Sequence, residues 1–280
     1  NPQFNIRNHY FFNSKRNWYL ESTVKAEYTD ISVYNENLKK SGLYNQKHFS
    51  FEVKANKLIT GNFTAGIGSR YEYLKYSPEI ETFPRVYGKI NFLTGFVDLH
   101  FNNLNSPSYP NSGNIIDFEA GVNYNQHPDF KYDDGNSATP QSSPLFSKKA
   151  YYSIKYYSAH YLPIHKHSLF FKLHSGVHFG NKQPFLNDFI VGGNDLVIRN
   201  QILFPGFRTN SIFSSSVIAP QVGLHYSVTK KLVVTATSSF LKYDFIKSNI
   251  IIDENHGNSS VWGVALAAGY RSFIGPLEAI

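Results

Sequence analysis

The 280-residue chain contains no cysteine. It therefore has neither a disulfide framework nor a thiolate that could bind a metal or act as a nucleophile. It also contains no methionine, and Asn1 follows no recognisable signal peptide, so we expect a mature or partial chain. No stretch approaches the roughly 18 consecutive apolar residues of a transmembrane helix, so any membrane span must be built of strands.

Blocks of like charge are missing as well. The formal net charge is +7, but lysine and arginine are scattered along strands and loops. No block reaches the roughly five or more like charges that mark a nucleic-acid-binding arm. The excess of basic residues is better explained by charge in a barrel lumen and its loops, and no nucleic-acid partner is expected.

The motifs of catalysis and metal binding are absent too. A serine hydrolase of the nucleophile-elbow type needs a Gly-x-Ser-x-Gly motif, and the nearest match, residues 257–261, has Val261 where the second glycine must stand. His174 and His178 share a strand face but lie about 13 Å apart, too far for one metal ion. His165 and His167 lie at a turn with no carboxylate nearby. We therefore expect no catalytic residue, no metal site and no cofactor in these residues.

Aromatic residues are abundant, and apolar and polar residues alternate. The chain has 20 Tyr and 24 Phe, more than a soluble core needs and suited to girdles at two membrane interfaces. A period of two places alternate side chains on opposite faces of a strand. From 168 to 179 one face carries Leu169, Phe171, Leu173, Val177 and Phe179, and the other Ser168, Lys172, His174 and His178. The charged face requires a wet or protein-filled lumen if the strand crosses a membrane.

This alternation recurs about a dozen times and predicts an all-β fold, an antiparallel transmembrane β-barrel. A soluble sandwich or lipocalin-like barrel is the alternative, because it would also alternate. A short hairpin is expected at Ile59 to Asn62, and the apolar parity switches near Thr94 and Gly95, which indicates a bulge or a break there. The expected strands are 4–12, 18–28, 49–56, 63–73, 86–101, 116–124, 149–162, 167–179, 213–228, 232–244, 260–271 and one from Leu277.

The stretch from Gly180 to Phe213 interrupts this rhythm. An irregular insert of this length is expected only where the loop is functional or folds inward. We therefore interpret residues 180–212 as a plug loop in the lumen of a single barrel domain, 1–280. The last strand starts after Gly275 and Pro276 and has too few residues for a span, so the barrel is expected to be incomplete at both ends.

Three segments resemble landmarks of the outer-membrane assembly-factor superfamily that includes BamA and TamA. The first, from Asn102 to Gly113, resembles that superfamily's hairpin of amide residues, proline and glycine. The second and third resemble its inward-folding loop and its Gly-Pro turn. The landmark residues are Pro107, Pro110 and Gly113 in the hairpin, Gly192 and Gly193 with the tip Phe204, Pro205, Gly206, Phe207 and Arg208 in the loop, and Gly275 and Pro276 in the turn.

Within this superfamily the glycine pair and the tip look most similar to the barrels of patatin-like outer-membrane proteins. That resemblance implies a 16-stranded barrel, of which this chain would hold about 12 strands. It also implies that a patatin-type lipid hydrolase and a polypeptide-transport-associated domain precede the barrel in the full protein. Pro205 stands where an insertase would carry arginine. Residues 238–242 stand where insertases usually show a Phe, Asp and Gly set that docks the tip.

Arg208 at the tip is a candidate for pairing with the barrel wall. Arginine can pair bidentately with a carboxylate and so fix a loop in place. Asp117 and Glu119, on the polar face of a strand, are the candidate wall partners, and a solvated loop arginine is the alternative. Gly206 would allow a positive φ, and Phe204 and Phe207 would wedge against the interior.

The leading hypothesis is therefore a non-enzymatic barrel that anchors or helps export an N-terminal patatin-like lipid hydrolase. A BamA-like or TamA-like role in inserting or translocating outer-membrane proteins is the first alternative. A simple 12-stranded pore is the second, and it would require the strand from Leu277 to pair with the strand near Phe4. The expected partners are outer-membrane lipids, an N-terminal hydrolase domain or other outer-membrane proteins, and the expected location is the outer membrane of a Gram-negative bacterium.

Overall fold

The computed structural model describes residues 3–12, 16–34, 40–80, 85–133, 147–181, 183, 187–193, 199–207, 212–229, 231–245, 259–272 and 275–279. Its main element is one twelve-stranded sheet in which each strand pairs antiparallel with its neighbours. The order follows the sequence, except that β8 (His167–Gly180) pairs with β12 (Ser216–Ser227) because the three strands between them form a separate sheet. The predicted all-β antiparallel class and the expected twelve strands are thus confirmed.

The strands are mostly long enough to cross a bilayer. Those of the main sheet are β1 (Gln3–Phe11), β2 (Trp18–Tyr34), β3 (Lys40–Thr60), β4 (Phe63–Ile80), β5 (Arg85–Asn102), β6 (Gly113–Asp133), β7 (Tyr151–Ile164), β8 (His167–Gly180), β12 (Ser216–Ser227), β13 (Leu232–Tyr243), β14 (Ser259–Ser272) and β15 (Gly275–Ala279). The small sheet consists of β9 (Phe189–Val191), β10 (Gln201–Ile202) and β11 (Ile212–Ser214). A tilted span needs about 9–11 residues.

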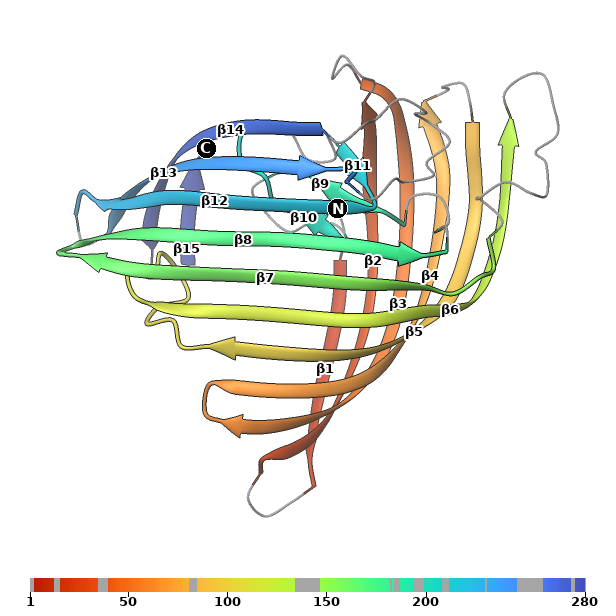
Figure 1. Ribbon diagram of the computed structural model, residues 1–280, viewed down its shortest axis with the longest axis horizontal. Coiled ribbons are helices and arrows are strands. Elements are labelled where there is room, and N and C mark those ends of the chain that lie inside the picture. Colours follow the sequence, from red (N-terminus) through yellow and green to blue (C-terminus); the bar gives the residue numbers. More distant parts are fainter. Residues whose placement is uncertain are drawn as a thin grey trace.

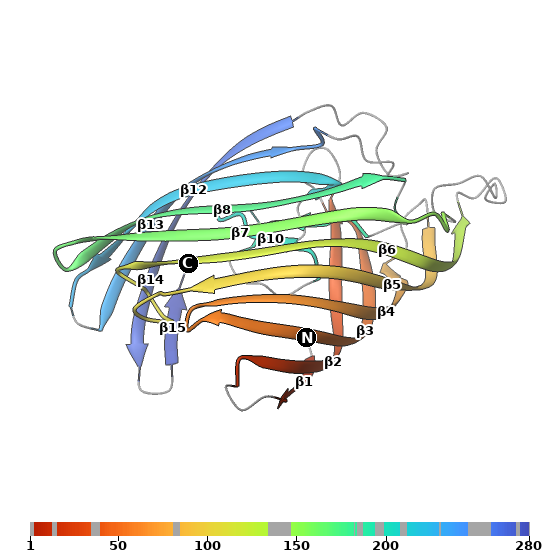
Figure 2. The same cartoon turned by 60° about the horizontal axis from the view of Figure 1, so that its bottom comes forward.

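The main sheet curls around the small one, as Figures 1 and 2 show. We call the space on its concave side the lumen. The two faces of each strand differ as the alternation predicts: in β12, Val217, Ala219 and Gln221 are buried, whereas Ile218 and Val222 are exposed. Large apolar side chains such as Ile67, Trp262 and Leu266 are 65–72% exposed on the convex face. An apolar convex face is what lipid requires.

The connections differ at the two ends of the sheet. The short-turn end carries 12–17, 61–62, 103–112, 165–166, 228–231 and 273–274, and the long-loop end carries 35–39, 81–84, 134–150, 181–215 and 244–258. The hairpin predicted around Gly61 is confirmed, since β3 ends at Thr60 and β4 begins at Phe63. In the described residues no helix is long and apolar enough to cross a membrane.

The irregularity predicted near Thr94 and Gly95 is misplaced. β5 is continuous through both residues, and its register against β6 shifts between Asn91 and Leu93 instead. Ile90 and Phe92 are each 1% exposed and lie on the same face as buried Thr94. They are apolar although they face the lumen, because they pack in a core cluster under the small sheet. The apparent switch of parity therefore reflects apolar residues inside the lumen.

The edges of the main sheet are β1 and β15. In the described residues β1 pairs only with β2, and β15 pairs only with β14. The pairing that a simple 12-stranded pore would require, between these two edges, is therefore not present in the described part of the chain.

The connection 181–215, called the inward segment below, is not irregular as expected. Its strand β9 pairs parallel with β10 and antiparallel with β11. Backbone polar groups away from water need hydrogen-bond partners, and a small sheet supplies them inside the lumen. Strands of two or three residues are too short to show an alternation in the sequence, which explains why they were missed.

Candidate functional site

The central strand of the inward segment, β9, links the two walls of the lumen. Phe189 and Val191 pack in a cluster that includes Val217 of β12 and Leu241 of β13. Ile190, between them, packs in the cluster of β2 to β6 side chains. All three are at most 2% exposed. Because neighbouring side chains of a strand point in opposite directions, β9 fills the space between the N-terminal and C-terminal strands of the sheet.

Phe189 is seated on a glycine of the wall. A Cβ added to Gly176 of β8 would overlap ring atoms of Phe189, so only glycine leaves room for the ring. The Phe189 ring also stacks on His178 of the same strand, with 4.3 Å between centroids and an interplanar angle of 10°. His174 accepts a hydrogen bond from the backbone N–H of Leu203 at 3.3 Å. The polar face of β8 that the sequence singles out therefore lies beside the inward segment.

The tip of the inward segment rests on β14. Phe204 is fully buried, and a Cβ added to Gly263 would lie 2.6 Å from the carbonyl oxygen of Pro205. Gly206 has a φ of +94°, in the left-handed region expected from the sequence, and lies next to Val264 backbone. Phe207 packs partly buried against the same cluster as Phe204. Close contact between backbone and backbone thus holds the tip against the wall.

The glycine pair, Gly192 and Gly193, lies where the inward segment turns back on itself, and Gly275 and Pro276 lie at the edge of the main sheet. Gly193 forms an isolated bridge with Phe204, and the Gly193 N–H donates to the Phe207 carbonyl at 3.0 Å. Gly192 and Gly193 both have positive φ. Gly275 and Pro276, predicted to form the turn before the last strand, are instead the first residues of β15, where they pair with Ser272 and Arg271.

Arg199 forms the ionic link between the inward segment and the wall. Its Nε and Nη2 donate to the two oxygens of Glu72 on β4 at 2.5 and 3.1 Å. Its Nη1 donates to Asn187 at 2.5 Å, and its guanidinium lies 5.3 Å from the ring of Phe92. Burial lowers the pKa of Arg199, but the Glu72 carboxylate raises it by more, so the pKa lies above its ordinary value. This bidentate pair fixes the segment to β4.

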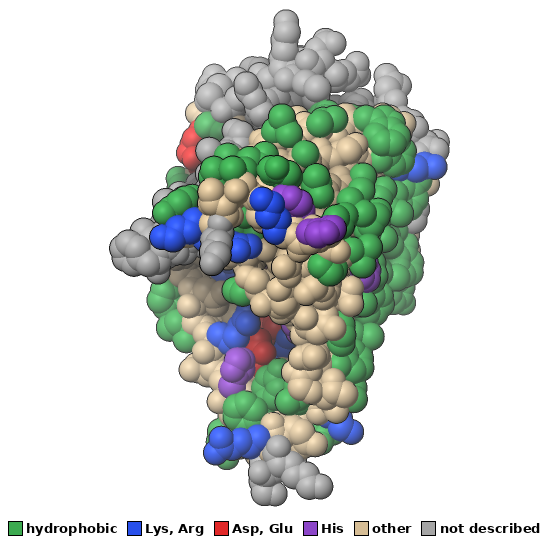
Figure 3. Space-filling model, turned by 90° about the vertical axis from the view of Figure 1, so that its left-hand side faces the viewer, with side chains coloured by type: hydrophobic (Ala, Val, Ile, Leu, Met, Phe, Trp, Pro, Cys, Tyr) green, Lys and Arg blue, Asp and Glu red, His purple; other side chains and the backbone are tan. Residues whose placement is uncertain are grey.

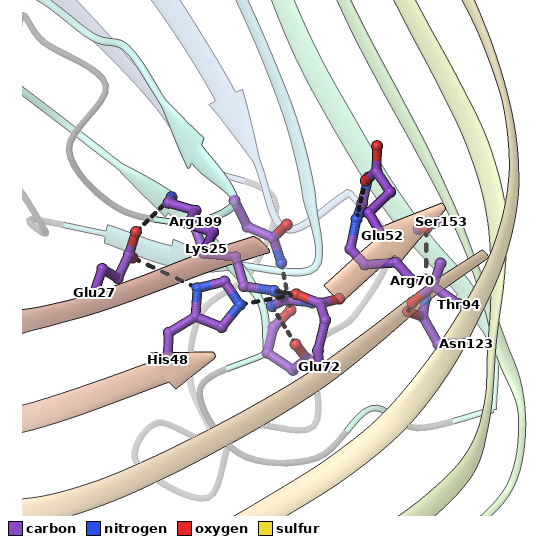
Figure 4. Close-up of polar contacts among 12 residues, drawn as sticks. Lys25, Glu27, His48, Glu52, Arg70, Glu72, Thr94, Asn123, Ser153 and Arg199 are labelled. Carbon is purple, nitrogen blue, oxygen red and sulfur yellow. Dashed lines mark hydrogen bonds and ion pairs between the residues drawn. The ribbon is translucent and has the colours of Figure 1, made fainter. Parts of the chain in front are cut away.

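Glu72 also belongs to a polar network along the wall. Its Oε1 lies 3.2 Å from Nε2 of His48, whose Nδ1 is 3.7 Å from Glu27, and Glu27 pairs with Lys25. Figure 4 shows these side chains of β2, β3 and β4 pointing into the lumen towards Arg199. Because Glu72 and His48 are almost fully buried, their charge and polarity are tolerable only while these partners are in place.

Asp117 and Glu119, which were predicted to pair with Arg208, instead pair with other side chains of the wall. Glu119 accepts from Arg70 at 2.8 Å and lies 3.1 Å from Lys155, and Arg70 also donates to Glu52 at 2.7 Å. Asp117 lies 2.5 Å from Nδ1 of His100. These pairs connect neighbouring strands and not the loop. Arg208 lies outside the described residues, so its pairing stays a prediction.

The sequence reasoning missed Arg199 because the glycine-rich tip carries the more conspicuous motif. The available signal was its position within the run 196–203, which is otherwise mostly apolar. An arginine in an apolar segment that folds inward needs a buried acceptor. The sequence alone cannot say that Glu72, which is 127 positions away, supplies it.

A second connection, 103–112, also folds across the lumen, at the short-turn end, and is called the clasp below. Pro110, which is buried, accepts a 3.1 Å hydrogen bond from the hydroxyl of Ser168 on β8. The carbonyl of Tyr109 accepts from Nη2 of Arg271 on β14 at 2.9 Å. A Cβ added to Gly269 would overlap the hydroxyl of Tyr109. The clasp therefore joins the β5–β6 turn to strands well beyond its neighbours in the sheet.

The clasp is ordered internally by its amide side chains. The Oδ1 of Asn105 accepts from the N–H groups of Asn111 and Ser112 at 3.1 and 3.2 Å. Gly113, with a φ of +103°, ends the clasp where β6 begins, and Pro107 is exposed. The hairpin landmarks of the sequence are thus the parts of one compact structure.

The chemistry available in the lumen is that of paired charges and stacked rings. Among the described residues there is no group of three His, Cys, Asp or Glu side chains that could hold a metal ion. The lumen wall is lined by charged and polar groups, and two segments from opposite ends cross it.

Comparison with known proteins gives a consistent assignment. A family model described as the OMP85 superfamily matches residues 8–280. BamA from Haemophilus ducreyi, solved without its POTRA domains 1–3, is similar in structure with a TM-score of 0.64 at 14% identity. CdiB from Acinetobacter baumannii is similar with a TM-score of 0.57 at 10% identity. The alignments cover 99% and 97% of this chain but 57% and 44% of those chains. A search of curated protein sequences finds no match.

Proposed function

This chain belongs to the OMP85 superfamily, and we propose that it is the barrel through which, or beside which, a polypeptide enters or crosses the outer membrane. It is an outer-membrane β-barrel of this type, and its similarity to BamA and CdiB shows the fold. In the proposed resting state the inward segment closes the lumen. The residues themselves perform no catalysis in this proposal, and no cofactor takes part.

The observation that carries the proposal is that the inward segment contacts both walls at once. Arg199 holds it to β4, and Phe204 and Pro205 hold it to β14. A segment attached only on one side could swing away without breaking contacts on the other. Attachment on both sides makes closure of the lumen a defined state that must be released before a chain can pass.

A reversible crosslink tests this role. The Gln221 side chain of β12 donates to the carbonyl of Leu203 at 2.9 Å, so cysteines at these two positions are within reach of a short reducible crosslinker. These 280 residues contain no cysteine, so within the barrel only the two introduced cysteines can react. In the full-length protein reconstituted in vesicles, we expect crosslinking to stop insertion of a urea-unfolded outer-membrane β-barrel substrate and reduction to restore it. Unchanged insertion in the crosslinked protein would refute the role of the segment.

A second candidate is the anchoring or export of a linked patatin-like lipid hydrolase. It is favoured by the glycine pair Gly192 and Gly193 and by the tip 204–207, which resemble the patatin-linked branch. It predicts a Gly-x-Ser-x-Gly elbow encoded upstream of this chain. Phospholipase activity should then be present in the full-length protein and be abolished by Ser→Ala in that elbow. A gene whose upstream region encodes no such elbow would exclude this candidate.

A further inference from the structure

The two ends of the barrel differ in the charge of their connections. The six connections at the short-turn end contain no aspartate or glutamate and five lysines and arginines, namely Lys15, Arg16, Lys166, Lys230 and Lys231. Each of the five connections at the long-loop end contains at least one acidic residue, such as Glu36, Glu81, Asp134, Asp188 and Asp253. The connections at the short-turn end therefore carry positive charge and no negative charge, whereas those at the long-loop end carry both.

The cations at the short-turn end whose placement the structure describes are exposed and have no carboxylate partner among the described residues. We call Arg16, Lys57, Lys166, Lys231 and Arg271 the basic rim; all five are exposed. Figure 3 faces this end and shows Lys, Arg and His side chains spread around its margin. At the long-loop end, in contrast, Lys89 lies 3.7 Å from Asp129, and Asp30 and Glu79 are exposed nearby. The rim thus presents unneutralised positive charge.

Lys57 shows which surface the rim faces. It lies on the face of β3 that also carries Phe49 and Phe51, which are 40% and 43% exposed, and this is the face turned to lipid. Its Nζ lies 5.3 Å from the ring of Trp18. A lysine at the end of a lipid-facing row, beside a tryptophan, places its ammonium at the level of the lipid headgroups. His167, stacked on Tyr226 at 4.2 Å, lies at the same end.

We propose that the basic rim binds the phosphates of anionic phospholipids in the membrane leaflet at the short-turn end. Short turns face the periplasm in bacterial outer-membrane barrels, so this leaflet is the periplasmic one. Clustered lysine and arginine beside a bilayer attract anionic headgroups. The rim would gather these lipids around the end of the barrel that the clasp crosses and would hold that end at the headgroup plane.

Lipid selectivity of the full-length protein in vesicles tests the rim. Spin-labelled phosphatidylglycerol and spin-labelled phosphatidylcholine compete for the barrel surface in phosphatidylcholine vesicles. We expect a severalfold preference for phosphatidylglycerol at low salt, falling towards none near 1 M salt, where screening acts over about 3 Å. The quadruple variant R16Q/K57Q/K166Q/K231Q should lose most of the preference. Arg271 is left intact because it also holds the clasp.

A matched variant at the other end is the control. K47Q/K75Q/K131Q/K149Q removes the same charge from exposed side chains at the long-loop end and should keep the preference. Equal loss in both variants, or no preference in the unmodified protein, would overturn the proposal. So would a rim variant that keeps lipid selectivity but no longer binds an acidic polypeptide, because the rim would then serve a protein partner. If the rim variant does not fold, the salt dependence of the unmodified protein is the test. A preference for phosphatidylglycerol that does not fall with salt would overturn the proposal.

Discussion

The inward segment and the clasp both cross the lumen, but they are attached by different forces. The inward segment is attached by buried Phe189 and Phe204 and by close backbone contact of its tip on one wall, and by the Arg199–Glu72 ion pair on the other. The clasp depends on its backbone, since the carbonyls of Tyr109 and Pro110 accept hydrogen bonds from the wall. Single substitutions can remove the Arg199–Glu72 ion pair or disturb the contact of Phe189 with Gly176. The clasp is attached through several weaker bonds, so the loss of one of them should leave it in place. We therefore expect the clasp to open less readily than the inward segment.

Among substitutions in these two segments, removal of Arg199 should have the largest effect on the attachment to the wall. Arg199→Ala leaves the Glu72 carboxylate buried without its bidentate partner, and breaking a buried pair in this way costs about 3–5 kcal/mol. The inward segment should leave the wall. The reporter is Ile202→Cys, at a position that is 2% exposed in the unmodified protein. Its thiol should change from protected to reactive towards a water-soluble thiol reagent, and single-channel conductance should rise.

The control for this substitution is Arg70→Ala, which removes a partly buried arginine of the wall that does not contact the inward segment in the described residues. The reporter thiol at position 202 should stay protected in that background. The double variant R199M/E72Q, which removes both charges, should restore part of the protection. A reporter thiol that stays protected in Arg199→Ala would show that apolar packing alone holds the segment.

Filling the space above Gly176 should have an intermediate effect. In Gly176→Ala the new methyl group would overlap the Phe189 ring, and overpacking of this kind costs about 1–3 kcal/mol. The reporter thiol at position 202 should become partly reactive. Gly61→Ala, where a Cβ meets nothing within 4 Å, is the matched control and should have no effect. Adding Phe189→Ala to Gly176→Ala should relieve the clash and make the thiol at position 202 less reactive again. A thiol that stays as reactive as in Gly176→Ala would mean that Gly176 does not accommodate the Phe189 ring.

Weakening the clasp should have the smallest effect. Arg271→Gln replaces a charged donor to the Tyr109 carbonyl by a neutral one at an exposed position, so the loss should stay below about 1.5 kcal/mol. Amide hydrogen exchange should become faster in 104–112 and stay unchanged in 187–193. Lys231→Gln, an exposed neighbour without a described contact to the clasp, is the control. Faster exchange in both segments would show that the clasp and the inward segment open together.

The sequence predicted the repetitive part of the molecule well and the contacts across the lumen poorly. Alternation identifies β8 and its two faces, because a period of two is a local property of each strand. The apolar lumen residues Ile90 and Phe92 misled the same reasoning, since they are buried by a segment that is about 100 positions away in the chain. The charge difference between the two ends could be read from the sequence once the strand boundaries were known.

The chain's sequence by itself determined a strand-built membrane barrel, the two faces of its strands and the presence of a segment that folds inward. Composition and period decide these features, and both act locally. Only the tertiary structure decided that Arg199 meets Glu72, that Phe189 is seated on Gly176 and that Tyr109 reaches Gly269. These contacts exist because the curvature of the sheet brings strands that are distant in sequence to opposite sides of one lumen, and curvature leaves no local pattern in the chain.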